Sequence, residues 1–359
     1  MYQMKRLFSL ILVILLTAAG LSAAVIEGPF LILSTPYNED GTVDYESLVK
    51  EARFAVKWKT SGVIWPQSND SIDLLTREER FTGMAALVED WVKHPSETIL
   101  TLGVSGDDTE DMLVYAREAE RLAVKSGVDM VLCARPPYYG ATIEQQQDYF
   151  EALAQVARRP VIIQTYVNDA CPTPPVGFLV NLAESYPKIY GWIKEESNKL
   201  EANERQREEL AATETIKTVF SAWGGWQWLY QRRQNGTSGL ISERVAYAPI
   251  TSCIWRLMKE GDNKNRLTEA YALYRLLIDQ RFLPYDSLRG YSLHYFVRLG
   301  IFKNKLSRVY AGAPDAPEGS YTRENKSKWI LEDIEISPSQ GAELDKCYDD
   351  MLRFVKRCK

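Results

Sequence analysis

Short apolar runs alternate with amphipathic stretches along most of this 359-residue chain. The apolar runs, each short enough for one strand, are Phe30–Thr35, Val63–Trp65, Thr98–Val104, Met130–Cys133, Val161–Tyr166, Tyr190–Lys194, Ile216–Phe220 and Gly239–Ser242. Helical patterns lie between them, and Thr76 and Glu79 have the spacing of a capping box at a helix start. Eight strand–helix units predict an α/β fold closed into a (β/α)8 TIM barrel. An open doubly wound sheet is the alternative, but the short strands and similar crossovers favour the barrel.

The first 24 residues depart from this pattern. Lys5 and Arg6 precede the apolar run Leu7–Ala19, and small residues follow up to Ala24. This layout predicts a secretory signal peptide over residues 1–24, and therefore an exported protein, periplasmic or secreted. The apolar run is shorter than the roughly 20 residues of a membrane span, so we expect no stable span after cleavage. A misassigned start codon, with Met4 as a candidate, would instead leave the protein in the cytoplasm.

The end of the chain also differs from the repeating part. We expect the barrel to occupy residues 25–258 and a purely helical extension to occupy residues 259–359. Helical patterns in the extension cover residues 264–280, 287–300 and 340–356. The polar segment 311–340 is expected to form a surface loop.

Charge and residue counts exclude several classes of function. The net charge is 43 − 48 = −5 with a pI near 5.4, which disfavours nucleic acid as a partner. The two histidines, His94 and His294, are too few for a histidine-rich metal centre, and a serine–histidine triad is nearly excluded. Phosphate-binding and dinucleotide-binding glycine motifs and paired CxxC motifs do not occur in the sequence. We therefore expect neither a metal nor a cofactor.

Reactive side chains at strand ends are the candidates for chemistry, because a β/α barrel carries its active site at the carboxyl ends of its strands. Lys194 ends the sixth apolar run, and Tyr166 ends the fifth. A lysine is usually a solvated surface charge, and Glu195 or Glu196 could pair with it. Inside a barrel the neutral amine is favoured, and a neutral amine can attack a carbonyl. A phenol on the next strand could move the protons, although Tyr166 could equally be a packing residue.

Five runs of the sequence resemble those of one family, in its order. They are STPYNEDGTVD, LLTREER, PPYYG, GWIKEES and GTSGLIS. Over residues 28–258 the chain resembles the dihydrodipicolinate synthase and N-acetylneuraminate lyase family. The resemblance implies a barrel with a helical extension, and Schiff-base aldolase or dehydratase activity on a 2-keto acid.

The resemblance also implies roles for particular residues. Lys194 takes the place of the Schiff-base lysine. Tyr166, 28 residues earlier, fits the catalytic tyrosine, although a count from Pro160 puts that position at Gln164. Tyr139 matches a tyrosine that reaches a neighbouring subunit, which implies a homo-oligomer, either a dimer or a tetramer. Ile241 matches a backbone contact to substrate in the eighth strand.

The chain departs from the family pattern in its expected substrate loop. Where the family has two glycines and two hydroxyl residues, this chain has the run from Gln67 to Ser71. Ser68 keeps a hydroxyl and Asn69 offers an amide, so both remain candidates for binding the substrate carboxylate. The region near Cys171 contains no arginine for a second carboxylate, which disfavours dihydrodipicolinate synthesis. Trp192, two residues before Lys194, replaces a usual glycine and is expected to reshape the floor of the site.

Two functions from different classes are compatible with this pattern. The first is an exported lyase that cleaves or dehydrates a 2-keto acid, possibly sugar-derived, through Lys194. The second is a barrel that has lost turnover and binds a keto acid or sugar acid without catalysis. The missing glycines of the substrate loop motivate the second hypothesis.

Overall fold

A computed structural model describes residues 25–68, 72–137, 140–165, 171–198, 200–242, 245–260, 264–279, 288–310 and 329–357. The predicted leader over residues 1–24 lies outside this part of the chain. Within the described residues, no helix is long and apolar enough to cross a membrane.

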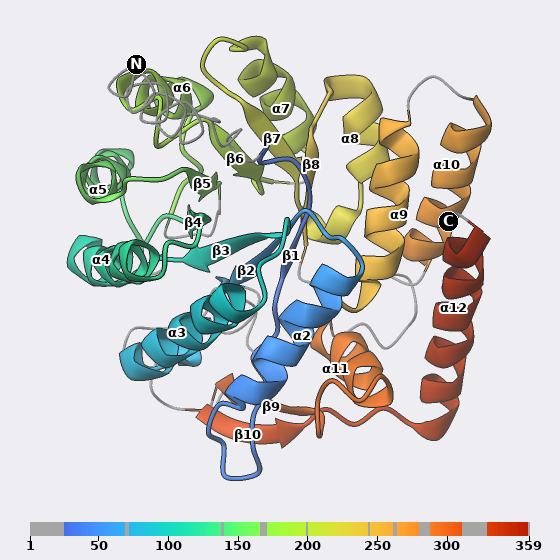
Figure 1. Ribbon diagram of the computed structural model, residues 1–359. Helices are drawn as coiled ribbons and strands as arrows, with labels where there is room; N and C mark the ends of the chain where they lie inside the picture. The colour runs from blue at the N-terminus through green and yellow to red at the C-terminus, as the bar shows by residue number, and fades with distance from the viewer. Residues whose placement is uncertain are drawn as a thin grey trace, which may run out of the picture.

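Eight parallel strands form a closed barrel, as the sequence predicts (Figure 1). The strands are β1 (Gly28–Ile32), β2 (Gly62–Trp65), β3 (Ile99–Gly103), β4 (Met130–Ala134), β5 (Val161–Gln164), β6 (Trp192–Glu195), β7 (Thr218–Ser221) and β8 (Gly239–Ser242). Strand β1 pairs with β2 on one side and with β8 on the other, which closes the ring. The open doubly wound alternative is therefore wrong.

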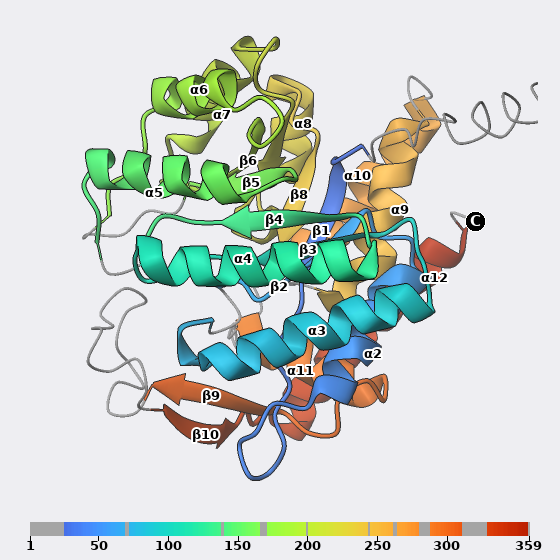
Figure 2. The same ribbon diagram turned by 60° about the vertical axis from the view of Figure 1, so that its left-hand side comes forward.

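Helices connect the strands and surround the barrel. They are α2 (Tyr45–Lys57), α3 (Arg77–Lys93), α4 (Thr109–Ser126), α5 (Ile143–Val156), α6 (Val176–Ser185), α7 (Ala202–Ala211), α8 (Trp228–Asn235) and α9 (Ala248–Lys259). In the described part of the chain, short 3-10 turns precede three of these helices: η2 (Ile72–Leu74), η3 (Trp223–Gly225) and η4 (Val245–Tyr247). Figure 2 shows α3 to α6 following one another around the outside of the strands. The predicted capping box is present at the start of α3, where Thr76 and Glu79 bond to each other's backbone.

The barrel interior is a packed apolar core with side chains from every strand. Its buried members are Ile26, Phe30, Ile32, Ile64, Ile99, Val131, Cys133, Ile162, Phe220 and Ile241. Phe30 and Phe220 meet edge to face, with ring centroids 5.3 Å apart. A Cβ atom at Gly62 would lie 2.3 Å from the Phe30 ring, so only glycine leaves room for that ring. Trp192 packs against this cluster as a partly buried residue, and Lys217 Nζ lies 4.0 Å from the centroid of its indole.

The chain after the barrel is helical but also contains a small sheet. Helices α10 (Lys264–Asp279) and α12 (Pro338–Arg357) pack against α9, and α11 (Leu288–Arg298) contacts η4 and α12. Strands β9 (Leu306–Tyr310) and β10 (Trp329–Asp333) pair antiparallel. The expectation of a purely helical extension is wrong here, and β10 and the start of α12 lie in the expected loop 311–340. Five-residue runs are too short for periodicity to distinguish a strand from other structure.

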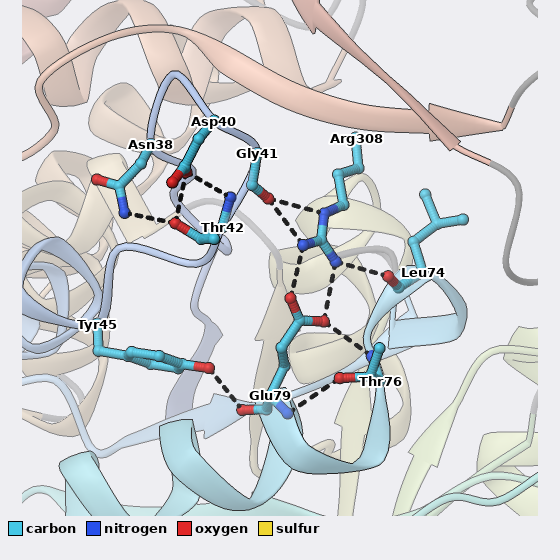
Figure 3. A network of polar contacts seen from close by, with 9 residues as sticks. All are labelled: Asn38, Asp40, Gly41, Thr42, Tyr45, Leu74, Thr76, Glu79 and Arg308. Atoms are coloured by element: carbon cyan, nitrogen blue, oxygen red, sulfur yellow. Dashed lines mark hydrogen bonds and ion pairs between the residues drawn. The ribbon is translucent and has the colours of Figure 1, made fainter.

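Arg308 joins this β9–β10 hairpin to the barrel (Figure 3). Its guanidinium donates two hydrogen bonds to the Gly41 carbonyl, at 2.7 and 3.2 Å, and one to the Leu74 carbonyl at 2.9 Å. It also makes a bidentate pair with Glu79, at 2.6 and 2.9 Å. The Arg308 side chain is only 3% exposed, and its guanidinium carbon lies over the rings of Tyr37 and Trp329. The hairpin is therefore fixed to the loop after β1, to η2 and to the start of α3.

Candidate active site

Lys194 lies inside the barrel, near the carboxyl end of β6. The side chains of strand residues alternate between the two faces, so Lys194 points to the same side as Trp192 in the interior cluster. Lys194 is 1% exposed, which excludes the solvated surface lysine considered from the sequence. A buried ammonium needs a partner of opposite charge. That partner is Glu196, whose Oε2 lies 2.8 Å from Lys194 Nζ.

The neighbouring strand places an amide beside this ion pair. Gln164 in β5 is the register partner of Lys194 in β6. Its Nε2 donates a hydrogen bond to the same Glu196 oxygen that contacts the lysine. Gln67 Nε2 in turn donates to Gln164 Oε1 at 2.5 Å and lies 3.4 Å from Cys133 Sγ. We call these five residues the interior polar chain: Lys194, Glu196, Gln164, Gln67 and Cys133.

The Cys133 thiol of the interior polar chain does not compete with the amine as a nucleophile. Burial raises the pKa of Cys133 to about 12, and the positive charge of Lys194 offsets only part of this effect. At neutral pH the sulfur is therefore protonated, and the thiolate is the form that reacts. The lysine amine is the nucleophile that this arrangement offers.

Backbone and side-chain hydrogen bonds hold the strand end that carries Lys194. Thr165 Oγ1 accepts a hydrogen bond from the Glu196 N–H at 2.7 Å, and the Thr165 N–H donates to the Lys194 carbonyl at 3.0 Å. Glu195 points away from the barrel interior and accepts hydrogen bonds from the Ser197 N–H and from Arg205. Of the two glutamates named from the sequence, Glu196 is thus the partner of the amine.

A buried carboxyl lies on the outer side of the same strand. Glu209 in α7 is fully buried, and burial together with the nearby Glu195 raises its pKa well above the usual range. Burial and the neighbouring carboxylate both favour the neutral form of Glu209, because a neutral acid avoids a second buried negative charge beside β6.

Two of the expected substrate-binding residues lie in the described part of the chain. Ser68 follows Gln67, so its loop adjoins the interior polar chain. Its Oγ is buried and has no hydrogen-bond partner among the described residues, which leaves this hydroxyl available to a ligand. Ile241 in β8 is 1% exposed, and its side chain belongs to the interior core. The proposed backbone contact of Ile241 with substrate stays a prediction.

Three expected site residues lie outside the described residues: Asn69, Tyr139 and Tyr166. The structure does show what stands beside the lysine on β5, namely Gln164. Its place matches the position reached by counting from Pro160, while Tyr166 as the catalytic phenol stays a prediction. Gln67 was not predicted to lie inside the barrel. Side chains alternate along a strand, and Trp65, two residues earlier, packs outside the barrel, so alternation would place Gln67 outside as well.

An arginine lies near Cys171 in space although none is near it in sequence. Burial raises the pKa of Cys171 to about 11, and the charge of Arg135 opposes this shift. Arg135 follows β4, is 2% exposed and bonds both oxygens of Asp73, at 3.0 and 3.3 Å. Its charge is therefore matched by a carboxylate. The prediction against dihydrodipicolinate synthesis stays open.

Comparisons with known proteins find relatives of this chain in sequence and in structure. The 4-hydroxy-tetrahydrodipicolinate synthase of Neisseria gonorrhoeae (strain ATCC 700825 / FA 1090) is 25% identical over 180 residues, which are 50% of this chain and 58% of that protein. This chain thus spans somewhat more than half the length of that relative. The structure of the same-named enzyme from Methylacidiphilum fumariolicum SolV superposes with a TM-score of 0.71 at 17% identity, covering 93% of this chain and 99% of that one.

A second solved structure is that of a prophage protein of the dihydrodipicolinic acid synthase family from E. coli K12, in complex with pyruvate. It has a TM-score of 0.64 at 15% identity and covers 92% of this chain and 99% of that one. At such identities these two likenesses show the shared fold. A sequence model of the dihydrodipicolinate synthetase family matches residues 26–284, well over half of the chain. The chain belongs to the dihydrodipicolinate synthetase family.

Proposed function

We propose that this protein is a class I aldolase or dehydratase that forms a Schiff base between Lys194 and a 2-keto acid. The observation that carries the proposal is the buried amine of Lys194, held at the carboxyl end of the barrel and 2.8 Å from a carboxylate. Burying this ion pair removes two charges from water at a cost that their attraction need not offset, so a gain in stability does not account for it. Family membership and the pyruvate complex of a structural relative support the substrate class.

The chemistry follows from the groups in contact. The amine must lose a proton before it can attack the carbonyl carbon of the keto acid, with loss of water to give an iminium. The iminium withdraws electrons, so a carbon–carbon or carbon–oxygen bond close to the former carbonyl can break or form. In this proposal the Ser68 hydroxyl, which has no partner among the described residues, donates a hydrogen bond to the substrate carboxylate. Exclusion of water by the packed core below strengthens these polar contacts.

Further parts of the proposal concern the setting of the enzyme. We propose a sugar-derived keto acid as substrate, because Ser68 keeps a hydroxyl and the sequence near Cys171 lacks the arginine that dihydrodipicolinate synthesis would need. A homo-oligomer follows from the match of Tyr139 to a tyrosine that serves a neighbouring subunit. Export, with cleavage after Ala24, is proposed from the leader sequence. Light scattering of the purified protein tests the oligomer, and the mass of the mature protein tests cleavage after Ala24.

Borohydride trapping tests the proposed Schiff base directly. Incubation with pyruvate and sodium borohydride is expected to add one reduced pyruvyl group, found by mass spectrometry on the peptide that contains Lys194. Lys194→Arg should abolish the adduct. Lys217→Arg is the matched control, because Lys217 is a part-buried lysine that contacts Trp192, a residue on the strand of Lys194. The Lys217→Arg variant should keep the adduct. An unmodified Lys194 across a panel of 2-keto acids would refute the proposal.

One observation favours the non-catalytic alternative. Gln164 stands beside Lys194, and an amide cannot replace a phenol as an acid or base. A binding barrel should show a higher melting temperature with a keto acid or sugar acid, retained in Lys194→Ala, without any adduct in the parent protein. An adduct in the parent protein, with ligand stabilisation lost in Lys194→Ala, excludes this alternative.

A further inference from the structure

We infer that Glu196 is the catalytic acid–base residue that takes the proton from Lys194 and returns it to the departing water, a role that needs no phenol on the neighbouring strand. This inference rests on the proposed Schiff-base function and adds a residue to it. It starts from the shortest contact of the amine, the 2.8 Å distance between Lys194 Nζ and Glu196 Oε2.

The other groups around the amine are poorly suited to this task. Gln164, the register partner of Lys194, carries an amide that does not ionise. Cys133 is the other titratable group of the interior polar chain, and burial keeps its thiol protonated. Glu195 lies on the opposite face of the strand, where it bonds Arg205. Among the described residues, Glu196 therefore combines contact with the amine and a carboxylate that can accept a proton.

The structure holds the carboxylate in a defined orientation. Glu196 is 6% exposed, its N–H donates to Thr165 Oγ1 at 2.7 Å, and its Oε2 also accepts from Gln164 Nε2. Gln164 is itself held by Gln67. Gln164 is thus a positioning residue for Glu196. Fixed orientation reduces the reorganisation that proton transfer requires.

The proton balance closes without any additional reactant. The Lys194 N–H bond breaks and a Glu196 O–H bond forms, which leaves a neutral amine and a neutral acid. The amine nitrogen bonds to the carbonyl carbon, the carbonyl electron pair moves to oxygen, and one nitrogen proton passes to that oxygen to give the carbinolamine. Glu196 then protonates the hydroxyl group, which leaves as water. The products are the iminium cation, the Glu196 carboxylate and one water.

The test measures the rate of Schiff-base formation with pyruvate, trapped by borohydride, from pH 5.5 to 9. General acid–base groups typically contribute about 10²–10⁴-fold, so Glu196→Gln should slow adduct formation by at least roughly a hundredfold. It should also change the shape of the pH–rate profile, because the group that takes the proton from Lys194 is lost. Glu196→Asp should recover part of the rate, because it keeps a carboxylate at a longer distance. Formate should partly rescue Glu196→Ala, a result that a purely structural role would not produce.

Control variants separate this inference from the proposed function. Glu195→Gln changes the carboxylate on the other face of the strand and should keep the wild-type pH profile. Tyr166→Phe should reduce the rate less than Glu196→Gln does. A wild-type rate and profile in Glu196→Gln, with an intact adduct on Lys194, would overturn the role of Glu196 alone. If the wild-type protein forms no adduct, the proposed function fails together with this inference. Thermal melting shows whether each variant folds. If Glu196→Gln does not fold, the rescue of Glu196→Ala by formate tests the role of Glu196 instead.

Discussion

Replacing Arg308 by methionine is expected to release the β9–β10 hairpin from the barrel. The guanidinium joins the hairpin to Glu79, Gly41 and Leu74, which belong to three separate segments of the barrel (Figure 3). Methionine fills part of the same space but can make none of these bonds. The change therefore removes the polar link while keeping some of the packing.

The magnitude follows from burial of the two partners. Removing one partner of a buried ion pair costs about 3–5 kcal/mol. Arg308 is 3% exposed and Glu79 19% exposed, so some water reaches the carboxylate and the lower limit applies. We expect the hairpin to lose about 3 kcal/mol of local stability, which corresponds to a roughly hundredfold increase in its opening equilibrium.

Amide hydrogen exchange of β9 measures this opening directly. Exchange of residues 306–310 should become roughly a hundredfold faster in Arg308→Met. Glu79→Gln keeps a capping box with Thr76, because glutamine also serves at that position, so it tests the ion pair alone. Arg298→Met is the matched control: its pair with Asp349 is more exposed, and its loss should cost at most about 1 kcal/mol.

The pH dependence provides a second check. Burial alone would raise the pKa of Glu79, but the hydrogen bonds from Arg308 and Thr76 outweigh this effect and lower it. A lowered folded-state pKa stabilises the protein above the unfolded pKa and loses this stabilisation as the pH falls through the folded value. Hairpin protection should therefore fall at acidic pH in the wild type and depend less on pH in Arg308→Met. Unchanged exchange of β9 in a folded Arg308→Met protein, or no coupling between Arg308 and Glu79 in a double-mutant cycle, would refute this reasoning.

Three further changes have defined outcomes. Burial and Glu195 raise the pKa of Glu209, so this carboxyl stabilises the fold at acidic pH, and that stabilisation is lost as the pH rises towards the folded-state pKa. The difference in melting temperature between Glu209→Gln and wild type should therefore shift in favour of the variant from pH 5 to pH 8. Cys133, with a pKa of about 12, should resist iodoacetamide at pH 8 in the native protein and react after unfolding, as peptide mass mapping can show. Gly62→Ala places a Cβ atom 2.3 Å from Phe30 and should destabilise the fold by about 1–3 kcal/mol in urea unfolding.

The strand–helix alternation was sufficient to predict the barrel because the eight apolar runs are short and the helical patterns between them are of similar length. The β9–β10 hairpin could not be predicted in this way. Its strands are five residues each, and the contacts that stabilise it join Arg308 to Glu79, 229 positions earlier in the chain. No local pattern contains such a contact.

The candidate site was predictable only where strand alternation applies. Lys194 and Glu196 are two residues apart at a strand end, so one face receives both, and the sequence already named Glu196 as a possible partner. Gln67 lies beyond the end of β2, where alternation fails, and its bond to Gln164 depends on the closed ring of strands. The register of β5 against β6 decided which residue stands beside the lysine, and only the three-dimensional pairing determines a register.

The resting site also bears on the choice between catalysis and simple binding. Lys194 and Glu196 form an ion pair in the protein interior, and a ligand that separated them would leave two unpaired charges, at a cost of several kcal/mol. A keto acid that reacts with the amine avoids this cost, because the iminium carries the same positive charge at the same nitrogen beside the same carboxylate. The ion pair therefore favours a ligand that bonds to the nitrogen over one that displaces it, and it favours the covalent function over the binding one.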